Sequence, residues 1–159
     1  MEKIAWLVLG SLAFVAALNS RHDDRWRTVG LVSLGVLFTV FGALVNLVYL
    51  LTDTDFGPFA DDSWIPFVRD TWRDVVAPKQ TFWIGLLIAF EAIVGVLLLL
   101  RGRFATVGLV AALGFHVALL VFSWWIWAWC VPMIITLVLL LRAQLRSADQ
   151  ASSGTVVRV

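Results

Sequence analysis

Residues 104–141 read FATVGLVAALGFHVALLVFSWWIWAWCVPMIITLVLLL, a stretch of 38 residues without a charged side chain. As one helix it would be roughly 57 Å long, far more than the ~30 Å hydrocarbon core of a bilayer. The stretch must therefore fold back on itself. We expect the turn in the tryptophan-rich segment 123–129, with Pro132 tolerated in the first turn of the following helix. This predicts two membrane-spanning helices, at residues 104–122 and 127–142.

Three further apolar runs predict additional spans. Residues 28–52 lie in an uncharged run, and residues 80–100 carry a single charge, Glu91. Both have the length of about 20 residues that a helix needs to cross a bilayer. The first run, at residues 4–19, is short, and its Val15-Ala16-Ala17 could pass for a signal-peptidase site. We favour a retained span over a cleaved signal because three arginines follow the run at once.

Composition indicates the same fold class, an all-α polytopic bundle of five transmembrane helices within residues 1–146. Hydrophobic residues make up 61% of the 159 residues and charged residues 14%, whereas a soluble domain carries roughly 25% charged residues. The single cysteine, Cys130, excludes a disulfide within the chain and Cys-x-x-Cys redox chemistry. Residues 147–159 are rich in small and polar residues, and we expect a disordered cytoplasmic tail.

Basic residues and tryptophans give one consistent topology. Eight of the twelve Lys and Arg residues fall in the segment 20–27, the turn 101–103 and the C-terminal tail, which share one side of a five-span bundle. Basic residues favour the cytoplasmic side, and tryptophans favour membrane–water boundaries. Eight of the nine tryptophans lie on or near the opposite side. We expect a multi-pass protein of a bacterial plasma membrane, with its N-terminus outside and its C-terminus in the cytoplasm.

The outer loop, residues 53–79, is the one sizeable segment outside the predicted spans. Apolar residues at helical spacing, including Trp64 and Trp72, alternate with charged residues. We expect an amphipathic helix lying in the outer interface, with Ser63 as its N-cap and Pro78 at its end. Such a helix would shield the end of the bundle as a lid; the alternative is a docking surface for a substrate or partner.

Glu91 lies near the middle of its span, where a carboxylate costs at least ~2.5–3.5 kcal/mol on insertion scales. It must face the bundle interior, as a neutral acid bonded to another helix or as a proton carrier or ligand contact. His116 is the natural partner to test. The tight turn Arg101-Gly102-Arg103 makes these two helices antiparallel neighbours, and the two residues differ in height by about 4.5 Å. The alternative is a neutral histidine bonded to a backbone carbonyl.

Small residues form seams on several predicted spans. Asn46 and Tyr49 extend the seam on residues 28–52 toward the outer end, and with Glu91 and His116 they would line an outward-opening polar pocket. Seams of small residues are typical of close helix packing in membranes. The glycines expected to pack in this way are Gly35, Gly42, Gly85, Gly95 and Gly108.

Several chemistries are excluded by the residues present. His22 falls in an inner loop, so the chain lacks the facing histidine pair of a membrane haem. There is no zinc-binding cluster and no Gly-rich phosphate loop. Ser123 is a poor nucleophile for His116, since it is expected at the surface. A net charge of +1 gives no basis for nucleic-acid binding. We predict no metal, no cofactor and no catalytic residue.

The segment from Phe90 to Gly102, with Glu91, Gly95, a leucine run and a Gly-containing turn, resembles the DoxX-like family of small bacterial membrane proteins. The resemblance covers roughly residues 28–142 and implies a four-helix core, to which residues 4–19 add an N-terminal helix. Some members are similar to the membrane subunit of a thiosulfate:quinone oxidoreductase. The resemblance carries no established catalytic role for Glu91.

Three functions remain open. The first is a non-enzymatic membrane subunit or scaffold of a larger complex, with a membrane protein partner or self-association and no cavity at Glu91. The second is a binder of a lipophilic small molecule, such as a quinone, lipid or thiol compound, in a redox system. It predicts a pocket lined by Asn46, Tyr49, Glu91 and His116. The third is a proton-coupled small transporter, which the absence of internal repeats disfavours.

Overall fold

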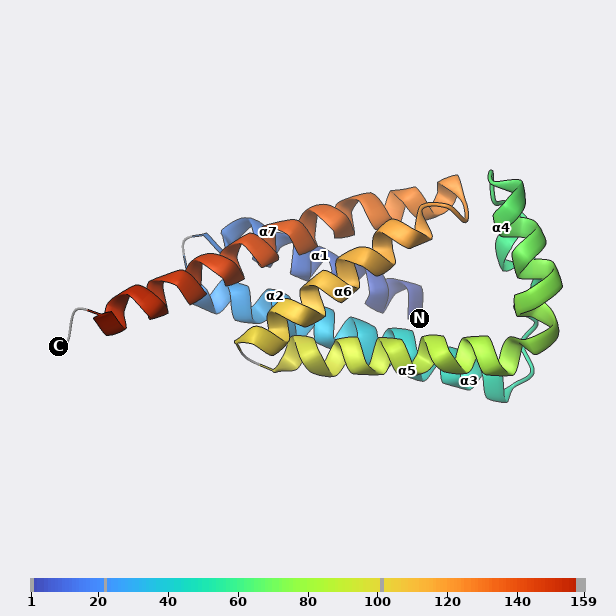
Figure 1. Cartoon of the computed structure of the whole chain (residues 1–159), viewed down its shortest axis with the longest axis horizontal. Coiled ribbons are helices and arrows are strands. Elements are labelled where there is room, and N and C mark those ends of the chain that lie inside the picture. Colours follow the sequence, from blue (N-terminus) through green and yellow to red (C-terminus); the bar gives the residue numbers. More distant parts are fainter. Residues whose placement is uncertain (1, 22, 101, 157–159) are drawn as a thin grey trace.

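Five long helical segments account for the apolar runs of the sequence (Figure 1). The computed structural model describes residues 2–21, 23–100 and 102–156, and within these ranges the regular structure is entirely helical. The segments are α1 (Glu2–Asn19); α2 (Asp24–Val36) continuing through η1 (Leu37–Leu44) into α3 (Val45–Leu51); α5 (Gln80–Leu99); α6 (Arg103–Leu119); and α7 (Trp124–Val156). His22 and Arg101, which figured in the sequence analysis, lie outside the described residues.

Three of the described helices are long and apolar enough to cross a membrane, judged by length and composition. They are Asp24–Leu51, Pro66–Leu99 and Trp124–Ala148. Two shorter apolar helices accompany them, Ile4–Asn19 and Arg103–Leu119. Large apolar side chains cover much of the outside of the bundle; Leu51 is 74% exposed and Ile4 66%. The apolar composition of the sequence is thus distributed over both the interior and the outer surface.

The five segments close into a ring. α1 packs against α2 and α7, the segment α2–η1 packs against α5, α5 packs against α6, and α6 packs against α7. The interior of this ring is filled by fully buried aliphatic side chains from four of the segments: Leu34, Val94, Leu98, Leu109, Leu137 and Leu140. Burying these side chains removes apolar surface from solvent on the inside of the ring. The helices α5 and α6 are neighbours, as their short connection predicts.

The outer segment stands across one end of the bundle (Figure 1). It comprises η2 (Gly57–Ala60), α4 (Pro66–Thr71), η3 (Trp72–Val76) and η4 (Ala77–Lys79), and η4 runs directly into α5. Pro78 therefore turns the helix through a corner and does not end it, because a proline breaks the hydrogen-bond ladder locally while the chain stays helical on both sides. Ser63 is not the N-cap, a position that Ile65 occupies. Its hydroxyl instead donates to the carbonyl of Val121 at 2.7 Å.

The turn between α6 and α7 is shorter than predicted. It occupies residues 120–123, and α7 begins at Trp124, so the tryptophan-rich segment is the first turns of a helix and not the turn itself. The backbone amide of Trp125 donates to the Ser123 hydroxyl at 3.3 Å, which satisfies one amide of the first turn. Pro132 lies inside α7. Proline removes one amide from the helical ladder but does not end the helix here, and the Thr136 hydroxyl adds a hydrogen bond to the carbonyl of Pro132 at 2.9 Å.

Helix α7 continues through Val156, where the sequence predicts a disordered tail from residue 147. Extending an existing helix needs no new nucleus, and residues 147–156 contain no proline. Residues 157–159 lie outside the described residues. Near the start of this extension, Arg27 of α2 donates a hydrogen bond to the Ser147 hydroxyl, so α7 is tied to α2 beyond its apolar part.

Two of the glycine seams meet in one contact. A Cβ at Gly95 would collide with Thr39 and lie 3.0 Å from the carbonyl oxygen of Gly35, and one at Gly35 would lie 2.7 Å from Leu99. Likewise, a Cβ at Gly108 would lie 3.0 Å from the backbone nitrogen of Leu98. These glycines bring α2–η1 and α6 close to α5 on its two sides.

Gly85 and Gly102 differ from the other glycines. A Cβ at Gly85 would meet no atom within 4 Å, so Gly85 does not mediate the close packing expected of it. Gly102, in the turn between α5 and α6, has a φ of 66°, a conformation that favours glycine. The carbonyl of Gly102 accepts a hydrogen bond from Gln144 of α7 at 3.1 Å, which fixes this turn to the bundle.

Candidate functional site

A cavity of about 960 Å³ opens between the helices, beneath the outer segment. Every one of the five long segments contributes to its wall, together with residues 56, 59, 72 and 76 of the outer segment. Ligand pockets in proteins have volumes of about 300–1,000 Å³. The four residues predicted to form a ligand pocket all line this cavity: Asn46, Tyr49, Glu91 and His116.

Glu91 lies on α5, and its side chain is directed at the continuous helix Asp24–Leu51 (α2, η1 and α3), called the second segment below. It is 5% exposed, and its Oε2 accepts a hydrogen bond from the amide nitrogen of Asn46 at 2.8 Å. A Cβ at Gly42 would lie 2.9 Å from both Cδ and Oε1 of Glu91, so glycine at this position makes room for the carboxyl group. The sequence analysis offered two alternatives for Glu91, a bond to another helix or a contact with a cavity. In the structure Glu91 both bonds Asn46 and lines the cavity.

His116 lies on α6 and is 4% exposed. Its Nδ1 is 2.9 Å from the carbonyl oxygen of Ala112, one turn earlier on the same helix. The ring packs edge-on against Phe38, with ring centroids 5.9 Å apart. The hydrogen bonds shown for Glu91 and His116 thus go to Asn46 and Ala112, and of the two alternatives for His116 the structure has the bond to a backbone carbonyl.

His116 and Glu91 contact successive positions along the second segment. Phe38 contacts His116, Gly42 faces Glu91, and Asn46 bonds Glu91. These three positions are four residues apart, along η1 and the start of α3, and so follow one another along the second segment. The cavity therefore runs from a polar inner part, at His116 and Glu91, toward the outer segment.

Aromatic side chains line the outer part of the cavity. Phe59, Trp72 and Phe122 form a cluster in which the ring centroids are 5.1–5.3 Å apart. Trp72 also donates from its indole nitrogen to the carbonyl of Phe56 at 2.9 Å. Trp64 is 62% exposed and does not line the cavity, but its indole nitrogen donates to the carbonyl of Leu120 at 3.2 Å. Of the two predicted lid residues, Trp72 touches the cavity and Trp64 holds the outer segment to the α6–α7 turn.

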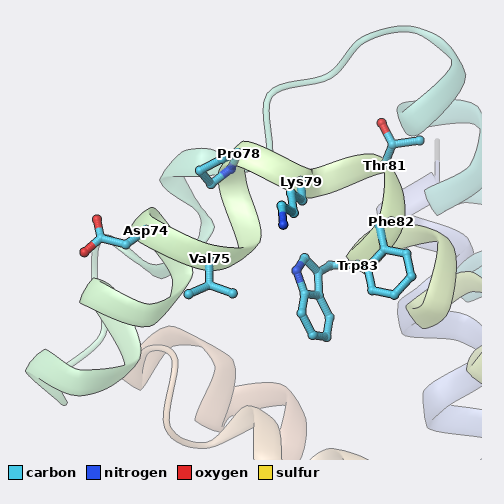
Figure 2. A pocket seen from close by; sticks show the side chains of 7 residues that line it. All are labelled: Asp74, Val75, Pro78, Lys79, Thr81, Phe82 and Trp83. Atoms are coloured by element: carbon cyan, nitrogen blue, oxygen red, sulfur yellow. The ribbon is translucent and has the colours of Figure 1, made fainter.

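A second hollow, of about 700 Å³, lies at the corner between η3 and α5 (Figure 2). Val75, Lys79 and Trp83 surround it, whereas the Asp74 carboxylate points away and bonds Arg73 at 2.9 Å. Trp83 lines both hollows and so forms part of the wall between them. Of the seven described residues that line this hollow, Lys79 is the one whose charged end points into it (Figure 2). The larger cavity combines four polar residues, Asn46, Tyr49, Glu91 and His116, and is therefore the better candidate for a specific site.

No family model, curated protein or solved structure matches this chain. The site is therefore interpreted from its own geometry. Among the described residues, no group of three or more His, Cys, Asp or Glu side chains is arranged to hold a metal ion.

Two features of the site escaped the sequence analysis. The first is the π-helical geometry of η1, which contains Gly42, the glycine against the Glu91 carboxyl group; π-helical turns occur often at functional sites. The second is the aromatic lining: twelve of the 21 Phe, Trp and Tyr residues of the chain line the cavity. The spacing of Phe38 and Phe41 beside the Gly42–Asn46 seam was the signal available in the sequence for part of this lining.

Proposed function

We propose that this chain is an integral membrane protein that binds a lipophilic small molecule in the cavity beside Glu91. The observation that carries the proposal is the cavity itself, which is large, mostly apolar and contacted by the four polar residues Asn46, Tyr49, Glu91 and His116. Binding sites for small molecules combine an apolar lining with a few convergent polar groups. A subunit or scaffold without a ligand would be expected to fill this space with side chains.

The membrane part of the proposal rests on the apolar helices and their outer surfaces. Three helices have the length and composition of spans, and two shorter ones complete a five-helix ring. In a bilayer, exposed side chains such as Leu51 and Ile4 would contact lipid instead of water. The excess of basic residues near the end opposite the outer segment supports an external N-terminus and a cytoplasmic C-terminus.

We also propose, as a working assignment, that the chain is a DoxX-like protein with an additional N-terminal helix. The segment that carries the resemblance contains Glu91 and Gly95, and these are also the residues at which α5 meets the second segment most closely. A redox role would follow if the ligand were a quinone or thiol compound, but neither is required by the geometry of the cavity.

Binding is tested with a decyl-substituted benzoquinone and the protein reconstituted in phosphatidylcholine nanodiscs. Tryptophan fluorescence is a suitable readout because Trp6, Trp72, Trp83, Trp125 and Trp129 line the cavity. We expect saturable quenching for the wild-type protein. Replacing Glu91 by Leu removes a polar group of the cavity wall together with its bond to Asn46, worth ~0.5–1.5 kcal/mol, and should weaken binding about three- to tenfold.

The matched control is Ile93→Leu, on the same helix, where the side chain is 60% exposed and does not line the cavity. Its binding curve should coincide with that of the wild-type protein. Quenching that rises linearly with probe concentration, with no saturation, would show partition into the bilayer alone and would contradict the proposal. Equal affinities for wild type and Glu91→Leu would remove Glu91 from the site.

A further inference from the structure

The ring of His116 has a defined donor and acceptor. Its Nδ1 lies 2.9 Å from the carbonyl oxygen of Ala112, and a carbonyl oxygen can only accept a hydrogen bond. The proton of the neutral imidazole must therefore be on Nδ1, which makes Nε2 the acceptor of the ring. Because His116 lines the cavity and its Nδ1 is bonded to Ala112, Nε2 is the ring nitrogen left to accept a hydrogen bond from a ligand.

The cavity offers no cation to a ligand. Its described lining residues include no Lys or Arg, and Glu91 is its one acidic group. An anion such as a fatty-acid carboxylate, a phosphate or thiosulfate would be moved from water to this apolar space without a compensating positive charge, which is strongly unfavourable. The lining therefore selects against anionic ligands.

The remaining lining is aromatic and aliphatic, and it extends from the inner polar groups to the Phe59–Trp72–Phe122 cluster. Tyr49 lies eleven residues, more than two helical turns, after Phe38 along the second segment. An elongated ligand with one polar end and an apolar body fits this distribution of polar and apolar groups.

We propose that the ligand is an uncharged, hydroxyl-bearing lipophile, of the phenol or quinol type, whose hydroxyl group donates a hydrogen bond to Nε2 of His116. This inference rests on the proposed function, because it specifies the chemistry of a ligand for the same cavity. Glu91 and the Asn46 amide lie on the adjacent wall and bond each other. His116 is therefore the group that accepts the hydrogen bond from the ligand's hydroxyl. The aromatic ring of the ligand packs among the aromatic side chains near His116, Phe38 and Phe115.

The test compares two probes that differ only in the donor. These are 4-nonylphenol and its methyl ether, 4-nonylanisole, titrated against the full chain in nanodiscs by tryptophan fluorescence. We expect the phenol to bind about tenfold more tightly than the ether, the equivalent of one net hydrogen bond in a buried site. Nonanoate, which carries a negative charge at neutral pH, should show no saturable binding.

Variants of His116 separate the contribution of the hydrogen bond to the binding affinity from that of the ring's shape. His116→Phe keeps a planar ring but removes the acceptor, and it should lower the affinity for the phenol to that for the ether without changing the latter. His116→Gln restores an acceptor and should recover part of the preference. Far-UV circular dichroism of each variant, and its unchanged affinity for the ether, show that the bundle is intact.

The possible results distinguish failure of the His116 hydrogen bond from failure of the proposed lipophile-binding function. Saturable binding of both probes with equal affinity would refute the role of His116 and leave a lipophile-binding cavity in place. Tighter binding of nonanoate than of the phenol would also overturn the inference, since it would require a positive charge in the cavity. Absence of saturable binding for every probe would contradict the proposed function itself.

Discussion

The close contact at Gly95 gives the sharpest prediction about how the bundle is held together. A Cβ at this position would lie 2.9 Å from the backbone nitrogen of Thr39 and 3.0 Å from the carbonyl oxygen of Gly35. Ordinary contacts between such atoms are about 3.5 Å or longer, so α5 and the second segment would have to separate by roughly half an ångström. Main-chain atoms cannot rotate away as a side chain does. Such overpacking costs about 1–3 kcal/mol.

Gly85→Ala is the matched control for Gly95→Ala. Both glycines lie within α5, and both substitutions gain the same helix propensity, ~1 kcal/mol in water. At Gly85, however, the new Cβ meets nothing within 4 Å. The difference between the two variants therefore isolates the packing cost, and we expect Gly95→Ala to be less stable than Gly85→Ala by about 1–3 kcal/mol.

The assay is equilibrium unfolding in mixed detergent micelles, with increasing mole fraction of dodecyl sulfate and tryptophan fluorescence as the signal. Gly95→Ala should unfold at a clearly lower mole fraction than Gly85→Ala, and Gly85→Ala should unfold at or above the wild-type value. Equal midpoints for the two variants would mean that the second segment does not approach α5 at Gly95, and the arrangement around Glu91 would lose its support.

Three further predictions follow from single contacts. Gly102→Ala places an L-residue at a φ of 66° with no new steric contact, and should lower the unfolding free energy by about 1–2 kcal/mol in the same assay; an unchanged midpoint would contradict this turn geometry. Ser63→Ala removes the 2.7 Å bond to the Val121 carbonyl and should speed amide exchange across the outer segment while leaving α5 unaffected. Thr136→Val removes the 2.9 Å bond to the Pro132 carbonyl and should cost ~0.5–1.5 kcal/mol in the unfolding assay; an unchanged midpoint would show that this bond does not stabilise α7.

The sequence predicted the helices well because a long helix that is shielded from water carries few charged residues, and this leaves a charge-free run that can be seen directly. Four of the predicted segments coincide closely with helices of the structure. The sequence also identified Glu91 as a buried carboxyl group, because a charge in an apolar helix has few acceptable environments. The partner of Glu91 was harder to predict. Asn46 is 45 residues away, and its contact depends on the rotation of two helices about their axes.

Other errors have local causes. Pro78 and Pro132 were interpreted as a helix end and a helix start, whereas the first lies at a corner within a longer helix and the second inside α7. Proline fixes its own φ and removes one donor, but it does not say whether the helix resumes beyond it. The π-helical turns of η1 have no clear residue pattern, and the aromatic lining comes from segments whose relative positions only the folded chain defines.

The central claim is that the space beside Glu91 and His116 is a binding site. Its most direct test is the location of a ring-brominated alkylphenol in crystals of the protein, found from the anomalous scattering of bromine. We predict a bromine peak inside the cavity, close to His116 and Phe115, that is weaker in His116→Phe crystals soaked at the same limiting concentration. Bromine found only on the outer surface of the bundle, with the cavity closed by side chains, would contradict it.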